Sequence, residues 1–103
     1  MGNPMRIRAT AQDGVTEVRV LMPHVMETGL RKDAAGAPIP AHFITELSVR
    51  HNDRVVLDAQ FGPAVSANPY LAFRFAGGAR GDRLSVSWVD NRGDSRTDEV
   101  QIA

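Results

Sequence analysis

The sequence predicts an all-β fold, a sandwich of two antiparallel layers built from seven strands. One supporting observation is that apolar and polar residues alternate with period two in seven short segments, as in half-buried strands. Another is that Gly, Pro, Asn and Asp separate these segments at short intervals, which is typical of tight turns. No segment carries a strong helical period. The pattern is typical of immunoglobulin-like and fibronectin-III-like sandwiches, and we expect one domain over residues 1–103.

The first two segments, residues 5–10 and 15–22, predict a β-hairpin. Asp13-Gly14 supplies the turn between them, because glycine adopts positive φ at little steric cost. Pro23 ends the second strand, because proline lacks the backbone N–H that a central strand needs. The residues expected on the inner face are Met5, Ile7, Ala9, Val18, Val20 and Met22.

Five further strands are predicted over residues 43–49, 55–61, 70–75, 84–88 and 95–102. In the first of these, Phe43, Thr45, Leu47 and Val49 are expected on one face, with Ile44, Glu46 and Ser48 on the other. In the others, the alternating residues are Val55, Leu57, Ala59 and Phe61, then Leu71, Phe73 and Phe75, then Leu84, Val86 and Trp88, and lastly Val100 and Ile102.

A long connection separates the second predicted strand from the third, over residues 23–42. It holds several glycines and prolines and no sustained period, and connections of such length inside a compact domain are usually functional or disordered. Met22 and Met26 lie near its start with Val25 and Leu30. Two interpretations remain open for these apolar residues: an adaptable partner surface, or packing onto the end of the sandwich.

Composition excludes several function classes. Acidic and basic residues balance at twelve each and no basic cluster stands out, so neither nucleic acid nor an anionic membrane is an expected partner. No apolar run approaches the length of a membrane span. Cysteine is absent, which excludes disulfides, thiolate metal ligands and a cysteine nucleophile. The N-terminal residues have no signal-peptide or transit-peptide character.

No catalytic, cofactor or metal site is predicted. His24 and His42 bracket the long connection, but their spacing and that of His51 match no metal signature, so surface or packing roles are expected. A histidine-centred enzyme is retained as an alternative. Arg-Gly-Asp occurs at residues 80–82 and 92–94. Gly-Asp is common in turns, so a role in turn formation is a simpler explanation than receptor adhesion. The carboxylates considered as an acid–base pair, most of them flanked by Arg or Lys, are Glu27, Asp33, Asp90, Asp94, Asp98 and Glu99.

Blocks of sequence in one order, from near residue 5 to residue 100, resemble the SoxZ family of the bacterial thiosulfate-oxidising Sox system. The blocks are Met5-Arg6-Ile7-Arg8-Ala9, Val18-Arg19-Val20-Leu21-Met22, Met26-Glu27-Thr28-Gly29, Arg31-Lys32-Asp33, Ile39-Pro40-Ala41-His42-Phe43-Ile44, Gly62-Pro63-Ala64-Val65-Ser66, Trp88-Val89-Asp90-Asn91 and Gly93-Asp94-Ser95-Arg96-Thr97-Asp98.

The resemblance implies an immunoglobulin-like sandwich that pairs with SoxY, whose C-terminal cysteine carries the covalent sulfur intermediate between Sox enzymes. This chain would be the non-catalytic half of that carrier, meeting the other Sox enzymes transiently through the complex. It implies a periplasmic location, reached by co-export with a signal-bearing SoxY. Without SoxY, an exposed apolar face would allow homodimers.

The long connection is the expected partner-contact region, and the turn over residues 90–96 is the second choice. The residues singled out for partner contact are Met26, Arg31, Lys32, Asp33, Pro40, His42, Asp90, Asn91 and Arg96. The alternative function is a generic immunoglobulin-like binding or scaffold module that uses the 23–42 loop.

Overall fold

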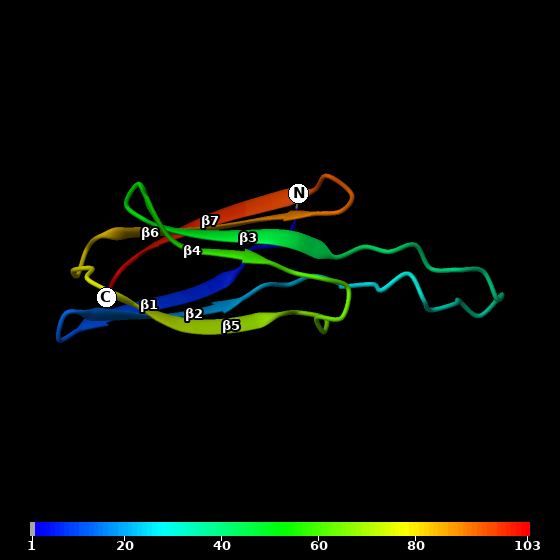
Figure 1. Cartoon of the computed structure of the whole chain (residues 1–103), viewed down its shortest axis with the longest axis horizontal. Helices are drawn as coiled ribbons and strands as arrows, with labels where there is room; N and C mark the ends of the chain where they lie inside the picture. The colour runs from blue at the N-terminus through cyan, green and yellow to red at the C-terminus, as the bar shows by residue number, and fades with distance from the viewer. Residues whose placement is uncertain (1) are drawn as a thin grey trace.

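The computed structural model describes residues 2–103, which form seven strands in two antiparallel sheets and no helix (Figure 1). The strands are β1 (Arg6–Gln12), β2 (Val15–Leu21), β3 (Ile44–His51), β4 (Arg54–Gln60), β5 (Tyr70–Ala76), β6 (Arg83–Asp90) and β7 (Ser95–Gln101). The predicted all-β sandwich is therefore confirmed. Within the described residues, nothing has the helical length and apolar character needed to cross a membrane.

The two sheets have strand orders β1-β2-β5 and β4-β3-β6-β7. Strand β4 thus pairs with β3, whereas in constant-type immunoglobulin domains the fourth strand joins the fifth. One side of the sandwich is closed by hydrogen bonds between β1 and the C-terminal residues. The amide of Ala11 donates to the carbonyl of Ala103 at 3.0 Å, and the Ala103 amide donates to Ala9 at 2.9 Å.

The core lies between the sheets and comes mainly from β2, β3 and β6, the strands with a neighbour on each side. Its largest member is Trp88, whose indole packs edge-to-face against the ring of His24. Central strands bury every second residue because the pleat turns alternate side chains to one face. The fully buried side chains include Val18, Val20, Met22, Ile44, Leu47, Val49, Leu84, Val86, Trp88 and Ile102.

Two β-bulges correct the predicted faces of the third and fourth strands. Ile44 and Leu47 are expected on different faces of the strand, yet both are buried, because the β3–β6 register shifts between Ile44 and Glu46. Val55 is expected on the same face as Leu57, yet it is 47% exposed, because the β3–β4 register shifts between Val49 and Arg50. An extra residue in one strand reverses the inward and outward parity beyond it.

The long connection leaves the sandwich at one end and gives the molecule its elongated shape of 54 × 20 × 19 Å (Figure 1). We call residues 23–42 the projection. Its outgoing and returning halves run side by side and meet at two isolated bridges, Glu27 with His42 and Lys32 with Pro38. The projection therefore consists of two neighbouring segments that pair at isolated bridges and form no regular strand.

Candidate functional site

Backbone hydrogen bonds join the two halves of the projection at its base and near its middle. Glu27 and His42 exchange both backbone hydrogen bonds, at 2.7 and 3.0 Å. Further out, the Ile39 amide donates to the Arg31 carbonyl at 2.9 Å. The Arg31 guanidinium also binds the Glu27 carboxylate, and this hydrogen bond lowers the pKa of Glu27. These contacts hold the excursion in a narrow shape without a regular strand.

The tip of the projection is organised by Asp33. Its Oδ1 accepts hydrogen bonds from the amides of Ala35 and Ala37, at 2.9 and 3.0 Å. The Asp33 amide donates to the Ala37 carbonyl at 2.9 Å, closing the same turn. A short carboxylate can satisfy turn amides in this way because it reaches its own following backbone. Asp33 therefore fixes the turn.

The base of the projection is tied to the sandwich by a cluster of His24, His42 and Asp90, which we call the hub. Asp90 is the last residue of β6, and its side chain is fully buried. Its Oδ2 lies 3.1 Å from Nε2 of His24 and 2.8 Å from Nε2 of His42. One carboxylate oxygen thus joins both halves of the projection to the four-stranded sheet.

The other carboxylate oxygen of Asp90 holds the β6–β7 turn. Its Oδ1 accepts the amides of Arg92 and Asp94, each at 2.9 Å. Burial by itself raises the pKa of Asp90, but the hydrogen bonds from His24, His42 and the two amides outweigh it and leave the pKa lowered. Asp90 is therefore an ionised acceptor at neutral pH.

The tautomer of His24 follows from its second nitrogen. The Met26 amide donates to Nδ1 of His24 at 3.1 Å, so Nδ1 carries a lone pair and Nε2 carries the proton given to Asp90. The His24 ring is also enclosed by His42 and Trp88, with ring centroids 4.7 and 5.1 Å away. Its orientation and tautomer are thus both set by neighbouring groups.

The hub has the residue types of a metal site, since two histidines and a carboxylate place ligand atoms within 4.8 Å of one another. Metal-binding histidines normally donate their second N–H to an acceptor, which leaves the ligating nitrogen unprotonated. His24 has the reverse arrangement, because its second nitrogen accepts from Met26. The donor set therefore fits a hydrogen-bonded clamp better than a resident metal.

Of the two interpretations of the apolar residues near the start of the projection, packing onto the sandwich is confirmed for the methionines, and a partner surface stays a prediction. Met22 and Met26 are buried in the core, and the Met26 Sδ accepts the Ile44 amide at 3.3 Å. Val25 and Leu30, in contrast, are 56% and 88% exposed. The methionines pack onto the end of the sandwich, and the aliphatic residues remain on the surface.

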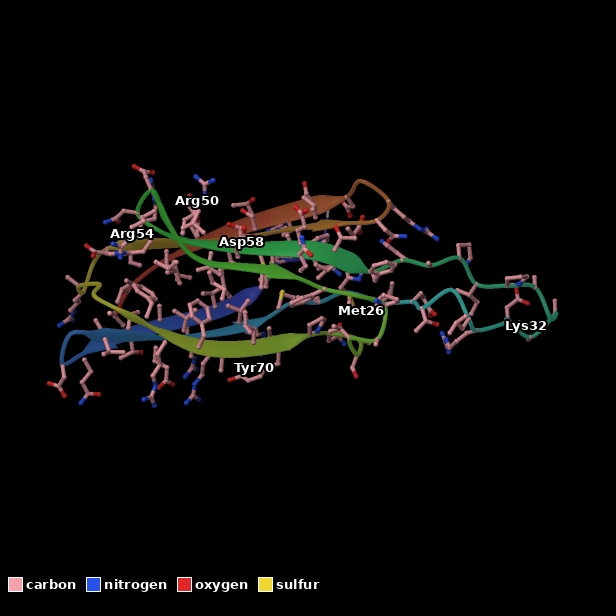
Figure 2. The ribbon with its side chains drawn as sticks, in the orientation of Figure 1. Met26, Lys32, Arg50, Arg54, Asp58 and Tyr70 are labelled. Carbon is pink, nitrogen blue, oxygen red and sulfur yellow. The ribbon has the colours of Figure 1, made fainter. Side chains whose placement is uncertain are left out.

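The predicted partner-contact residues fall into three groups. Lys32 is exposed on the projection (Figure 2), and so are Pro40, the Asp33 turn and the Arg31 side chain. Met26 and Asp90 are buried, and His42 is half-buried in the hub. Asn91 binds Ala41 and Phe43, and Arg96 binds Asp98 and the Gly2 carbonyl, so both stabilise this chain. Their contact with a partner stays a prediction.

Sequence reasoning did not find the role of His24, or that of Asn68. The Oδ1 of Asn68 accepts the His24 amide at 3.1 Å, and the Asn68 amide donates to the His24 carbonyl at 2.9 Å. These residues are 44 positions apart, and no local pattern signals such a contact. The placement of His24 and His42 at the two ends of the projection was the available clue, but nothing in the sequence indicated Asp90 as their shared partner.

Comparison with known proteins identifies the family. No curated protein matches the chain at a significant level. The family model described as "Sulphur oxidation protein SoxZ" matches residues 5–101, essentially the whole chain. The match spans both sheets, the projection and all three residues of the hub. The chain therefore belongs to the SoxZ family, whose role lies in sulfur oxidation.

Proposed function

We propose that this chain is the non-catalytic subunit of a SoxYZ-type sulfur carrier in bacterial thiosulfate oxidation. In this role it pairs with SoxY, whose cysteine carries the sulfur intermediate from one Sox enzyme to the next. The observation that carries the proposal is the family match over residues 5–101. The periplasm, reached by export together with SoxY, is the proposed location.

The absence of cysteine supports a divided carrier. Covalent sulfur transfer needs a thiol or another soft nucleophile to hold the sulfur, and none of the 103 residues supplies a thiol. The methionine thioethers of Met22 and Met26 are buried in the core. The covalent step therefore belongs to a companion chain, and this chain supplies a body that binds it.

The geometry of the projection supports a binding role. A recognition surface works best on a rigid support, because ordering a loose loop on binding costs free energy. The hub supplies that support by fixing both halves of the projection to Asp90. Leu30 is 88% exposed on the projection, where an isolated aliphatic side chain gains by being covered. We propose the projection as the surface that contacts SoxY.

Measuring association with SoxY from the same gene cluster tests both the carrier role and the projection as the contact surface. The full chain is mixed with purified SoxY, and complex formation is measured by calorimetry and by light scattering after gel filtration. The expected result is a one-to-one complex at micromolar concentration or below. The Leu30→Asp variant is expected to weaken it by about tenfold or more, as at an interface hot spot.

Val55→Asp is the matched control, because Val55 is an exposed aliphatic residue on β4, away from the projection. It is expected to leave the affinity unchanged. Equal weakening by both variants would remove the projection as the contact surface. No complex with wild-type chain, together with normal thiosulfate oxidation in cells lacking it, would overturn the carrier role and favour a generic binding module.

A further inference from the structure

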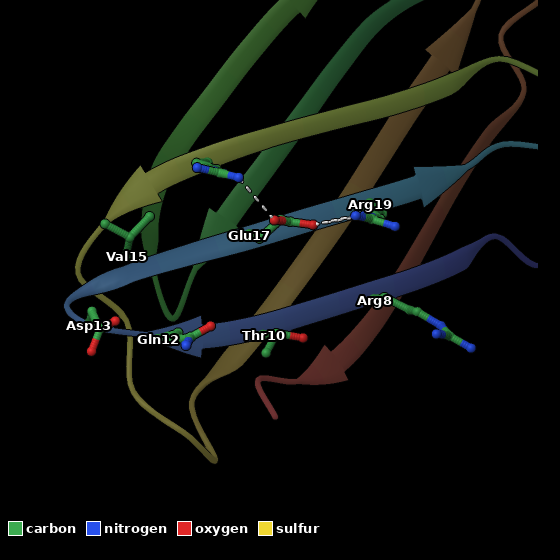
Figure 3. A pocket seen from close by; sticks show the side chains of 8 residues that line it. Arg8, Thr10, Gln12, Asp13, Val15, Glu17 and Arg19 are labelled. Carbon is green, nitrogen blue, oxygen red and sulfur yellow. Dashed lines mark hydrogen bonds and ion pairs between the residues drawn. The ribbon is translucent and has the colours of Figure 1, made fainter.

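The outer face of the three-stranded sheet carries arginines whose positive charge is only partly balanced by nearby carboxylates. Alternate residues of β1, β2 and β5 point away from the core, so Arg6, Arg8, Arg19 and Arg74 share this face. Among the described residues, Glu17 is the only carboxylate paired with any of them, and it binds Arg19 at 2.8 Å and Arg74 at 3.5 Å (Figure 3). We call these four arginines the arginine face.

The strand register brings two of these positive charges directly opposite each other. Arg8 lies directly opposite Arg19 in the β1–β2 pairing, and like charges at directly opposed positions destabilise a sheet. Within residues 2–103, neither Arg6 nor Arg8 has an ion-pair partner. Asp13 lies at the edge of the same shallow hollow, in the β1–β2 turn. The whole chain is balanced in charge, so this face concentrates positive charge that acidic residues offset elsewhere.

The chemistry of the face fits a protein surface better than a small ligand. It is open and follows the sheet, and the side chains of Arg19 and Arg74 are largely solvent-exposed; among residues 2–103, the side chains that line the hollow are exposed or half-buried. Tyr70, 60% exposed, borders it in the row of Arg6 and Leu21. Arginine and tyrosine are, with tryptophan, the residue types enriched among the residues that dominate protein–protein binding energy.

From this we infer that the arginine face is a transient docking surface for acidic surfaces of the enzymes that act on the carrier's cargo, an inference that rests on the proposed function. Permanent subunit interfaces resemble a hydrophobic core, whereas exposed charge mainly raises association rates. A carrier that serves several enzymes in turn needs fast association and fast release. An acidic partner would neutralise Arg8, which lies opposite Arg19 and has no ion-pair partner among the described residues.

The test uses the complex of the wild-type chain with its cognate SoxY, loaded with the sulfur intermediate. This complex is the substrate, and KM is measured for each purified Sox enzyme whose gene lies beside those of the two subunits. Arg8→Glu/Arg19→Glu is expected to raise KM about tenfold or more for at least one enzyme, with kcat and SoxY affinity unchanged. The wild-type KM is expected to rise between about 0.01 M and about 0.15 M NaCl, as the Debye length falls from ~30 to ~8 Å. The variant is expected to show a weaker salt dependence.

Arg50→Glu/Arg54→Glu is the matched control, since both arginines are exposed on the other sheet and the change in net charge is the same (Figure 2). Arg8→Ala/Arg19→Ala, which removes the opposed charges, repeats the test if the double glutamate variant unfolds. Equal KM values for face and control variants would overturn the inference and leave the carrier role intact. Loss of SoxY binding by the face variant would also overturn the inference, because the arginine face would then be part of the permanent interface with SoxY. If the wild-type pair neither associates nor turns over, the proposed function fails, and the inference fails with it.

Discussion

His24 and Asp90 are 66 positions apart in the chain, yet their Nε2 and Oδ2 atoms lie 3.1 Å apart in the interior. This hydrogen bond joins the start of the projection to the end of β6, and His42 adds the returning half at 2.8 Å. One carboxylate therefore binds both halves of the projection. The stability of the hub and the position of the projection should depend on the same residue.

Replacing Asp90 by alanine should destabilise the fold by about 3 kcal/mol, because the buried histidine and turn N–H donors lose their acceptor. Urea unfolding followed by the fluorescence of Trp88, the single tryptophan, measures this. Asp53→Ala is the control, because the Asp53 side chain is 94% exposed and its pair with Arg83 lies at the surface. That change should stay within about 0.5 kcal/mol. Equal effects would contradict a structural hub.

The contribution of Asp90 should depend on pH. Its pKa is lowered below the ordinary value of 3.8, so the folded state binds the proton less readily than the unfolded state. The stabilisation is therefore complete above the unfolded pKa and is lost as pH falls through the lower folded value. The difference in unfolding free energy between wild type and Asp90→Asn should be constant near neutral pH and shrink below about pH 4. Asn91→Ala, which removes neutral hydrogen bonds beside Asp90, should show a loss that is independent of pH there.

Zinc should leave the isolated chain unchanged. Coordination through Nε2 of His24 requires a proton on Nδ1, and that proton would face the donating Met26 amide. Adding Zn²⁺ should neither raise the melting temperature nor release heat with a one-to-one stoichiometry in calorimetry. His24→Ala serves as the comparison, since it should give the same zinc response as wild type. Stoichiometric binding that disappears in this variant would show the hub to be a metal centre.

The tip of the projection should loosen without loss of the fold when Asp33 becomes alanine. The amides of Ala35 and Ala37 then lose their acceptor, so their hydrogen exchange should accelerate while core amides keep their protection. Amide exchange followed by NMR measures both sets at once. Lys32→Ala is the control at a neighbouring exposed position, and it should leave tip exchange unchanged. A global rise in exchange would contradict the local role of Asp33.

Gly78 and Gly81 should respond differently to alanine although both have positive φ, at 85° and 91°. A Cβ on Gly78 would lie 2.1 Å from the Oγ1 of Thr16, a buried hydroxyl that donates to the Gly77 carbonyl. A Cβ on Gly81 meets nothing within 4 Å. Gly81→Ala should cost about 1 kcal/mol from backbone strain alone, and Gly78→Ala at least about 1 kcal/mol more from the clash. Thermal unfolding measures both, and equal costs would show that Thr16 gives way freely.

Local pattern was sufficient to predict the strands. Period-two alternation located all seven, because half-buried strands impose that period on any sequence that forms them. It failed where parity changed, at the bulges before Glu46 and after Val49, because an extra residue leaves no signal in composition. The chain likewise contained enough sequence blocks in a fixed order to identify the SoxZ family.

Three-dimensional packing decided the rest. His24 meets Asp90, and Arg8 faces Arg19, only because hydrogen-bonded register brings distant or antiparallel segments to fixed positions. The sequence shows that each of these residues is polar, but it does not show which residue is its partner. By itself the sequence determined which segments become strands and which family the chain belongs to. The folded structure determined which charges are buried, paired or left exposed, because these depend on contacts between residues that are far apart in the chain.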